Sequence, residues 1–446
     1  MLRPHRSIAL CAAALTGLVA CGDAPADDAP EADESVAFTV TVEGIAADHP
    51  FFVSGVFDTP VGDAEPGPLL PGARYELEFH APPGSRLSFA TMFVPSNDLF
   101  FAPAGEGIAL FDEQGQARSG DLSEEVLLWD AGTELDETLG LGPNQAPQQA
   151  GVGAGEPDDE PLRPASDTYE GLPPVSELIG VTLTPGEGNA FTLTIENRSS
   201  ATSLVLDDGT TSAVPLAPGV FVVHSQPDPL FTVGTDDRAP GLEALAEDGD
   251  PGELGVGLDD HSGVVSPVAP GLWSVHAAGE GLFVAGQPDA GLGLEALAED
   301  GDPMMLEASF EGANIGVFGG VYGDDISALE PGGAFILELE ASPGEHLSFV
   351  SMFGQSNDIF LSTGPEGISL FDAEGQPISR DISAELSLWD AGTEVNEVPG
   401  AGPNQAPRQP GPNTGPDEGG VVRLVDDGFD YPAPVELVRV IVSPTD

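Results

Sequence analysis

The sequence contains three acidic residues that could together bind a cation or transfer protons. Asp130 follows a strand-like apolar run that ends at Trp129, and a tight Ala-Gly-Thr loop brings Glu134 back toward it. Asp98 follows a second strand-like run, Phe93–Val94, after a Pro-Ser-Asn turn. If the two strand ends adjoin, three carboxylates converge, and because like charges repel they must take up protons or bind a cation. Hard oxygen ligands from loops favour Ca²⁺ over a transition metal, although the spacing matches no EF-hand loop.

The whole pattern occurs twice. The second copy places the acids at Asp358, Asp390 and Glu394, and Leu127–Glu134 returns almost unchanged as Ser387–Glu394. No gap opens between the copies over this block. A duplicated cluster of Asp, Glu, Asn and Gly beside a single Trp is typical of a built site, so we predict one cation site in each copy.

The same residues also allow a purely structural interpretation. The Asp side chains could accept hydrogen bonds from nearby backbone N–H groups and stabilise a turn without any metal. If a metal is bound, Glu137 or Glu397 could replace or join the third ligand. Trp129 and Trp389 are predicted to anchor the core, because each ends an apolar strand.

The charge of the chain limits its partners. Its 446 residues include 75 acidic and 12 basic side chains, giving a formal charge of −63, and none of the basic residues is lysine. Such a surface repels nucleic acid phosphates and anionic lipid headgroups and attracts divalent cations. Most of these carboxylates are predicted to form a solvated acidic coat.

The amino terminus has the features of an export signal. Residues 1–20 combine a charged start with the apolar stretch Ile8–Val19, which is too short to span a bilayer. They lead into Leu18–Gly22, which resembles the lipobox of bacterial lipoproteins. That resemblance implies a lipid on Cys21 and, because the next residue is not Asp, an outer-membrane location; an ordinary signal peptide is the alternative. Residues 21–36 are predicted to be an acidic, flexible tether.

Short runs of alternating polarity dominate the rest of the chain. Tyr75–Phe79 and Phe335–Leu339 both alternate with the period of two that indicates half-buried strands, and Pro-Gly pairs flank them as turn signals. Few segments have the periodicity and length of a helix. The sequence therefore predicts an all-β protein with two tandem antiparallel β-sandwiches.

We place the division between the two predicted domains after residue 186. The first sandwich would cover residues 37–186 and the second residues 187–446. Gly241–Pro251 recurs identically as Gly293–Pro303, at an offset of 293 − 241 = 52 residues. The second domain would then contain this unit twice and the first, abbreviated, domain not at all. Each unit is predicted to be a short helix whose acidic end forms a turn rather than a cation site.

The motifs and their order resemble the Spondin_N domain in its bacterial lipoprotein form. The resemblance rests on the Ser-Asn-Asp-Leu-Phe segment at 96–100, Leu-Trp-Asp-Ala-Gly-Thr-Glu at 128–134, Gly-Pro-Asn-Gln-Ala-Pro at 142–147 and their second copies. It implies a C2-like antiparallel β-sandwich. It also implies six Ca²⁺ ligands, namely Asp98, Asp130, Glu134, Asp358, Asp390 and Glu394.

Two positions depart from the motif of the animal members of that family. Glu134 and Glu394 stand where the animal motif has Asp, which is one methylene shorter. Leu99 and Ile359 follow the first Asp where the animal motif has Trp.

The leading hypothesis for function is a non-catalytic, lipid-anchored envelope module that binds or adheres to a protein or glycan. Ca²⁺ would fix its loops, and neither nucleic acid nor a small-molecule cofactor is expected. One alternative is a structural spacer without a ligand. Another is a metal-assisted hydrolase that uses the carboxylates as acid and base. The sequence contains no Gly-x-Ser-x-Gly elbow and no closely spaced His pair for zinc.

Overall fold

The computed structural model describes residues 35–445 apart from 311–313, 323–324 and 329–330. The predicted leader (1–20), Cys21 and nearly all of the predicted tether (21–36) lie outside the described residues. Within the described part of the chain, no helix has both the length and the apolar character needed to cross a membrane.

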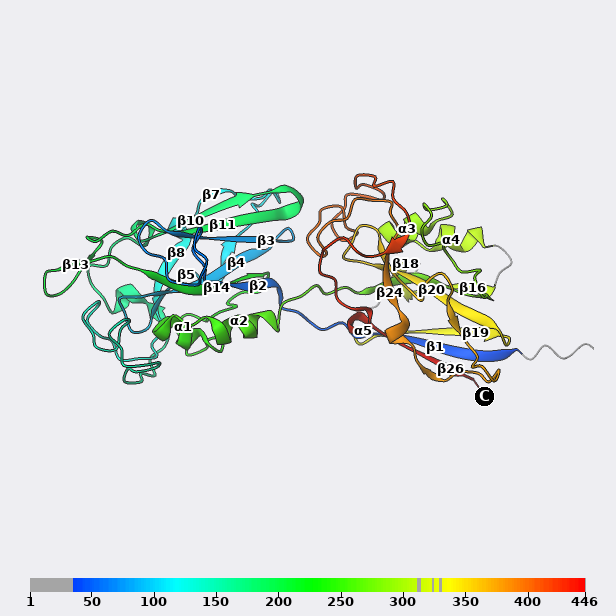
Figure 1. Ribbon diagram of the computed structural model, residues 1–446, viewed down its shortest axis with the longest axis horizontal. Coiled ribbons are helices and arrows are strands. Elements are labelled where there is room, and N and C mark those ends of the chain that lie inside the picture. The colour runs from blue at the N-terminus through cyan, green and yellow to red at the C-terminus, as the bar shows by residue number, and fades with distance from the viewer. Residues whose placement is uncertain (1–34, 311–313, 323–324, 329–330, 446) are drawn as a thin grey trace, which may run out of the picture.

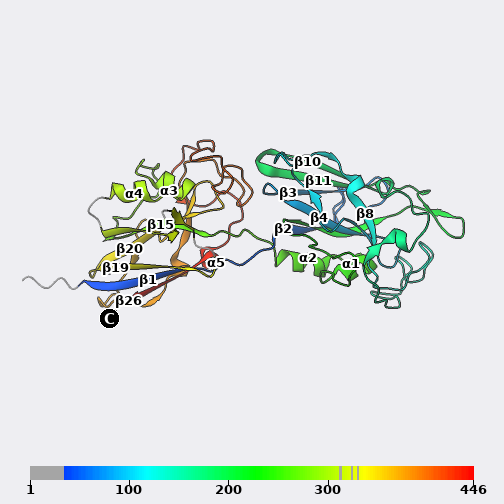
Figure 2. The same cartoon turned by 180° about the vertical axis from the view of Figure 1, so that it is seen from behind.

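Two β-sandwiches make up the described chain, and Figures 1 and 2 show them side by side from opposite directions. We call residues 51–263 the inner domain, and residues 36–46 together with 264–445 the outer domain. The chain leaves the outer domain after its first strand, β1 (Val36–Gly44), and returns to it at β15 (Val268–Ala277). The inner domain is therefore inserted into the outer one.

The inner domain packs a small sheet against a larger one, and all strand pairs in both are antiparallel. The small sheet has the order β3-β11-β10-β7, and the larger sheet has the order β2-β14-β4-β5-β8-β9, with β6 paired to β4. The strands are β2 (Phe51–Phe57), β3 (Arg74–His80), β4 (Arg86–Phe93), β5 (Leu99–Pro103), β6 (Ile108–Ala109), β7 (Gly120–Asp121), β8 (Val126–Asp130), β9 (Arg163–Pro164), β10 (Ile179–Pro185), β11 (Ala190–Asn197) and β14 (Leu216–His224).

The outer domain repeats this arrangement strand for strand. Its small sheet has the order β19-β1-β26-β23, and its larger sheet has the order β16-β15-β20-β21-β24-β25, with β22 paired to β20. Besides β1 and β15, the strands are β16 (Asn314–Phe318), β19 (Ala334–Ala341), β20 (Glu345–Phe353), β21 (Ile359–Ser362), β22 (Ile368–Ser369), β23 (Arg380–Asp381), β24 (Ser387–Asp390), β25 (Arg423–Leu424) and β26 (Val438–Pro444).

Short elements complete both domains. Two small hairpins are β12 (Leu204–Val205) with β13 (Thr211–Ser212), and β17 (Gly320–Tyr322) with β18 (Asp325–Ser327). The α-helices are α1 (Leu242–Asp248), α2 (Gly252–Asp259), α3 (Leu294–Asp300), α4 (Met304–Ser309) and α5 (Pro434–Leu437). The 3₁₀ turns are η1 (Ser123–Glu125), η2 (Ala165–Asp167), η3 (Val175–Glu177), η4 (Glu187–Asn189) and η5 (Ser383–Glu385).

The polarity pattern of each strand follows from the number of covered faces. Strands of the small sheets, such as β3 and β19, alternate between buried and exposed residues because one face meets the core and the other meets water. Strands β4 and β5 are almost continuously buried. Their sheet is covered on both sides, by the small sheet on one face and by helices on the other. The predicted all-β class is confirmed.

Helices α1 and α2 cover the outer face of the larger sheet in the inner domain. Leu242, Leu245 and Ala246 of α1 pack with Phe100 and Trp129 of the sheet in one cluster of buried residues. The helix ends at Asp248 as predicted, because the next residue, Gly249, has a positive φ of 66° and closes its last turn. Helices α3 and α4 cover the outer domain in the same way, with Trp389 in that second cluster. Both tryptophans are core anchors, as predicted.

The domain boundary predicted after residue 186 separates two strands that pair with each other. Strand β10 forms a hairpin with β11 across η4, so β11 belongs to the inner domain. Strand β1 lies between β19 and β26 in the outer domain, where Figure 1 shows it beside the carboxyl end of the chain. The inner domain is therefore not abbreviated. The repeated segments Gly241–Pro251 and Gly293–Pro303 each belong to one helical layer. The first lies in the layer α1–α2 of the inner domain, and the second lies in the layer α3–α4 of the outer domain.

Candidate metal centre

Strand pairing brings Asp98 and Asp130 together. Strand β5 pairs with β8 so that Leu99 lies opposite Asp130, and Asp98 immediately precedes β5. The sequence placed Asp98 at the end of a preceding strand, but β4 ends at Phe93 and Asp98 instead opens the next one. Asp98, Asp130 and Asp136 each offer a carboxylate oxygen, and these three atoms lie within 4.8 Å of one another. Asp98 and Asp130 are both fully buried.

The outer domain has the same arrangement with a different third acid. Asp358 precedes β21 and lies next to Asp390, the last residue of β24, and Glu418 completes the cluster within 4.8 Å. At the position that corresponds to Asp136 the second copy has Asn396, whose Nδ2 donates to Asp390 Oδ2 at 2.9 Å. The third carboxylate thus comes from a different loop in each domain. Neither third acid was predicted from the sequence: Asp136 has Asn396 as its counterpart, and Glu418 has the shorter Asp158.

Glu134 and Glu394, the predicted third ligands, lie outside these clusters. The backbone N–H of Glu134 donates to Asp98 Oδ2 at 3.3 Å, so its backbone rather than its carboxylate faces the site. The carboxylate instead accepts a hydrogen bond from Gly155 N at 2.7 Å. In the outer domain the Glu394 carboxylate accepts a hydrogen bond from Gly415 N at 2.7 Å. A side chain at either glycine would overlap the carboxylate in its present position and would displace it.

The alternative ligands Glu137 and Glu397 also lie outside the clusters. Glu137 accepts hydrogen bonds from the backbone N and the Nδ2 of Asn144, at 3.0 and 2.6 Å. Glu397 bonds to Asn404 in the same way. These glutamates therefore hold the repeated Gly-Pro-Asn-Gln segment in place.

One oxygen of the innermost aspartate remains without a partner. Asp98 Oδ2 accepts from Thr133 N at 3.1 Å, but Asp98 Oδ1 is buried and finds no hydrogen-bond donor among the described residues. Asp358 Oδ1 is in the same situation. A buried carboxylate oxygen without a partner is costly. The two buried acidic clusters could each hold a metal ion that supplies the missing partner.

The turn-stabilising interpretation is also partly right, because Asp130 has protein partners. Its Oδ1 accepts from Gly132 N at 2.8 Å, and its Oδ2 lies 2.9 Å from Arg163 Nη2. Arg163 also contacts Asp136 at 3.1 Å. In the outer domain Arg423 pairs with Asp390 and Glu418, each at 2.7 Å. An arginine retained at both positions, in a chain with only 12 basic residues, is a sequence signal that could have identified these partners.

The electrostatics of each cluster favour a bound cation or proton on the innermost aspartate. Burial and the neighbouring Asp130 carboxylate raise the pKa of Asp98 to about 7. Burial and Asp390 raise the pKa of Asp358 to about 7 in the same way. Each arginine partly neutralises the outer two acids of its cluster, so the innermost aspartate has the strongest need for a further positive charge.

Without a bound cation, the protein is expected to lose stability as the pH rises from about 4 to about 7. An unfolded Asp titrates near 3.9, roughly, whereas Asp98 and Asp358 titrate at about 7 in the fold. Between these values the native state holds protons that the unfolded state has lost, so stability falls with pH, by on the order of 2–4 kcal/mol per site. Thermal melting in chelator at pH 5 and pH 8 measures this change.

The control for this pH dependence is the variant that carries Asp98→Asn and Asp358→Asn, because it lacks the two titrating groups. Its melting temperature should fall less steeply over the same range. Equal slopes for the variant and the unaltered protein would contradict the assignment.

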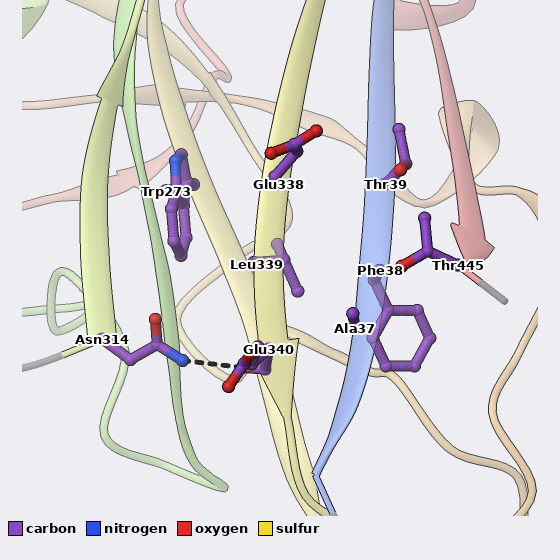
Figure 3. Close-up of a pocket in the computed structure, with 9 residues that line it drawn as sticks. All are labelled: Ala37, Phe38, Thr39, Trp273, Asn314, Glu338, Leu339, Glu340 and Thr445. Atoms are coloured by element: carbon purple, nitrogen blue, oxygen red, sulfur yellow. Dashed lines mark hydrogen bonds between the residues drawn. The ribbon is translucent and has the colours of Figure 1, made fainter.

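A groove of about 580 Å³ lies in the outer domain, away from both acidic clusters. It runs beside the edge strands β16 and β19, and Figure 3 shows Trp273, Asn314, Glu338 and Glu340 around it. The Trp273 ring lies over Gly316 on β16, and Asn314 Nδ2 donates to the Glu340 backbone oxygen at 2.7 Å. An aromatic ring next to two exposed carboxylates suits a cationic group.

Neither a protein-family model nor a curated protein matches this chain.

Proposed function

We propose that this protein is a non-catalytic module of the bacterial cell envelope, built from two Ca²⁺-stabilised, spondin-like β-sandwiches and anchored to the outer membrane by a lipid on Cys21. The Ca²⁺ ions would be held by Asp98 and Asp130 with Asp136, and by Asp358 and Asp390 with Glu418. Each ion would fix the start of one strand to the end of its neighbour. The rigid loops would then support binding or adhesion to a protein or glycan.

The observation that carries this proposal is that the buried Oδ1 atoms of Asp98 and Asp358 have no partner among the residues that the structure describes. An all-oxygen set of carboxylates suits Ca²⁺, which takes its ligands from loops and completes them with backbone carbonyls and water. The spondin resemblance of the repeated motifs supports the same metal. A structural spacer without a ligand remains the alternative, and it predicts a fold that does not respond to Ca²⁺.

A hydrolase is less well supported by the geometry. Asp98 and Asp130 have no exposed surface, so a substrate could not contact them in this conformation. Asp130 is also engaged by Arg163 and Thr168, which leaves it poorly placed to act as a base.

The groove beside Trp273 is the surface on which we expect a ligand, and its charge favours a basic segment of a partner protein over a neutral glycan. Full-length mature protein, with Ca²⁺, should bind an Arg-rich peptide, and Trp273→Ala with Glu338→Gln should weaken binding at least tenfold. The matched control is Glu78→Gln, which changes the corresponding exposed glutamate of β3 in the inner domain. Equal binding of the peptide by all variants would contradict a binding site in the groove. Binding of glycans but not of the peptide would favour a neutral glycan as the ligand.

A further inference from the structure

A second pair of buried acids lies next to each aspartate cluster. The pair in the inner domain is Glu134 with Glu247, and the pair in the outer domain is Glu394 with Glu299. Each of these four side chains is at least 95 % buried, with exposed fractions of 4 %, 5 %, 1 % and 2 %. Among the described residues, none of them forms an ion pair with an arginine or histidine.

The fold brings the two members of each pair together from different layers. Glu247 lies near the carboxyl end of α1, which covers the larger sheet, and Glu134 lies in the loop that follows β8. The same loop reaches both: Gly155 N donates to Glu134, and a side chain on Gly153, two residues earlier, would lie 3.9 Å from Glu247 Oε2. The carboxyl end of a helix carries partial negative charge, so it does not stabilise a carboxylate there but does favour a cation.

A long loop closes over each pair. In the inner domain Gly155 N donates to Glu134, while Gly153 N and Gln149 Nε2 donate to Asp248, the neighbour of Glu247. In the outer domain the equivalent bonds run from Gly415 to Glu394 and from Gln409 to Asp300. These loops bond to one oxygen of Glu134 and Glu394 and leave the other free.

The free oxygens are buried and lack partners. Glu134 Oε2 makes no hydrogen bond in the inner domain, and both Glu299 Oε2 and Glu394 Oε2 make none in the outer domain, among the residues that the structure describes. The hydroxyl of Thr133 lies beside Glu247 and lowers its pKa, although its oxygen has no well-formed hydrogen bond either. Each pair thus leaves buried carboxylate oxygens without a hydrogen-bond donor among the described residues.

We infer that each glutamate pair is a second cation site, distinct from the aspartate cluster, and that it takes a hard divalent cation such as Ca²⁺. The carboxylates of Glu247 and Glu134 bind the ion in the inner domain, and those of Glu299 and Glu394 bind it in the outer domain. The nearby threonine hydroxyl adds an oxygen ligand in the inner domain. Bound there, the cation ties the helical layer to the loop after β8 or β24, a connection that the aspartate clusters do not make.

The test is the number of Ca²⁺ ions bound per chain, measured by isothermal titration and by metal analysis in a salt concentration that screens the acidic surface. Full-length mature protein is expected to bind four. Glu247→Gln with Glu299→Gln should bind two, and the control Glu253→Gln with Glu307→Gln, on α2 and α4, should still bind four. Asp98→Asn with Asp358→Asn should retain the two glutamate sites, so failure of the aspartate sites can be told from failure of this inference.

Two outcomes would overturn the inference. One is that Glu247→Gln with Glu299→Gln binds as many Ca²⁺ ions as the unaltered protein. The other is an infrared band of a protonated carboxyl group, present with Ca²⁺ and lost in this variant, since it would show that each pair shares a proton instead. If the double variant does not fold, Glu247→Gln alone should lose one ion while the outer domain keeps both of its own.

Discussion

Replacing Asp98 and Asp358 together by Asn is expected to remove two bound Ca²⁺ ions per chain and to reduce the Ca²⁺-induced rise in melting temperature by several degrees. A ligand that binds only the native state stabilises it by about 2.7 kcal/mol at 100 times its dissociation constant. For domains of this size that energy corresponds to about 5–10 °C. The measurement is differential scanning calorimetry in Ca²⁺ and in chelator, with metal analysis of the same samples.

The same variant is expected to melt at a higher temperature than the unaltered protein in chelator at pH 8. The reason is that Asn cannot carry the buried charge that Asp98 carries above its pKa of about 7. Replacing Asp130 and Asp390 would be less informative, because each is paired with an arginine that would lose its partner. The control is Glu113→Gln with Glu374→Gln, which removes two exposed charges. An unchanged Ca²⁺ response and unchanged metal content in the aspartate variant would rule out these sites.

A fragment of residues 47–264 is expected to fold on its own, whereas a fragment of residues 37–186 is expected to remain unfolded. The first contains every strand of the inner domain and helices α1 and α2. The second lacks β14, the strand between β2 and β4, and lacks β11, the partner of β3 and β10. Removal of this central strand separates β2 from β4 and exposes an edge of each, and the loss of α1 and α2 uncovers the outer face of the sheet. Together these effects exceed the stability of an ordinary domain.

Circular dichroism and thermal melting of the two fragments check this expectation. The longer fragment should melt in a single cooperative transition, because its ends meet where Phe51 and Gly263 share a backbone hydrogen bond of 3.0 Å. A fragment of residues 37–263 is the control, since adding β1 should not raise the melting temperature of the inner domain. Cooperative melting of residues 37–186 would contradict the strand assignment.

The local features of the fold could be read from the sequence because they depend on neighbouring residues. The period of two in Tyr75–Phe79 predicted a strand with one face in water, and the helical face of Leu242, Leu245 and Ala246 predicted α1. The repeated motif predicted that Asp98 and Asp130 would meet. That prediction held because each borders one of two strands that pair directly, and such pairing fixes both side chains within a few ångströms.

The third member of each cluster could not be predicted in this way. Whether a side chain beyond a strand end points into the cluster depends on the path of the following loop. Glu134 turns away because its own N–H bonds to Asp98, and Asp136 or Glu418 takes the place in the cluster. Arg163 and Arg423 reach the clusters only because β9 and β25 pair with the strands that carry Asp130 and Asp390.

Repeated strands and a repeated acidic motif were evident from the order of the residues, but the assignment of each strand to a domain depends on contacts between distant parts of the chain. Strands β1 and β11 have nearly the same alternating pattern, so either could fill the same place in a small sheet. The short η4 turn places β11 beside β10, because closing a short loop costs little entropy. No further strand follows β26 among the described residues, and the open place beside it is filled by β1 from the other end of the chain.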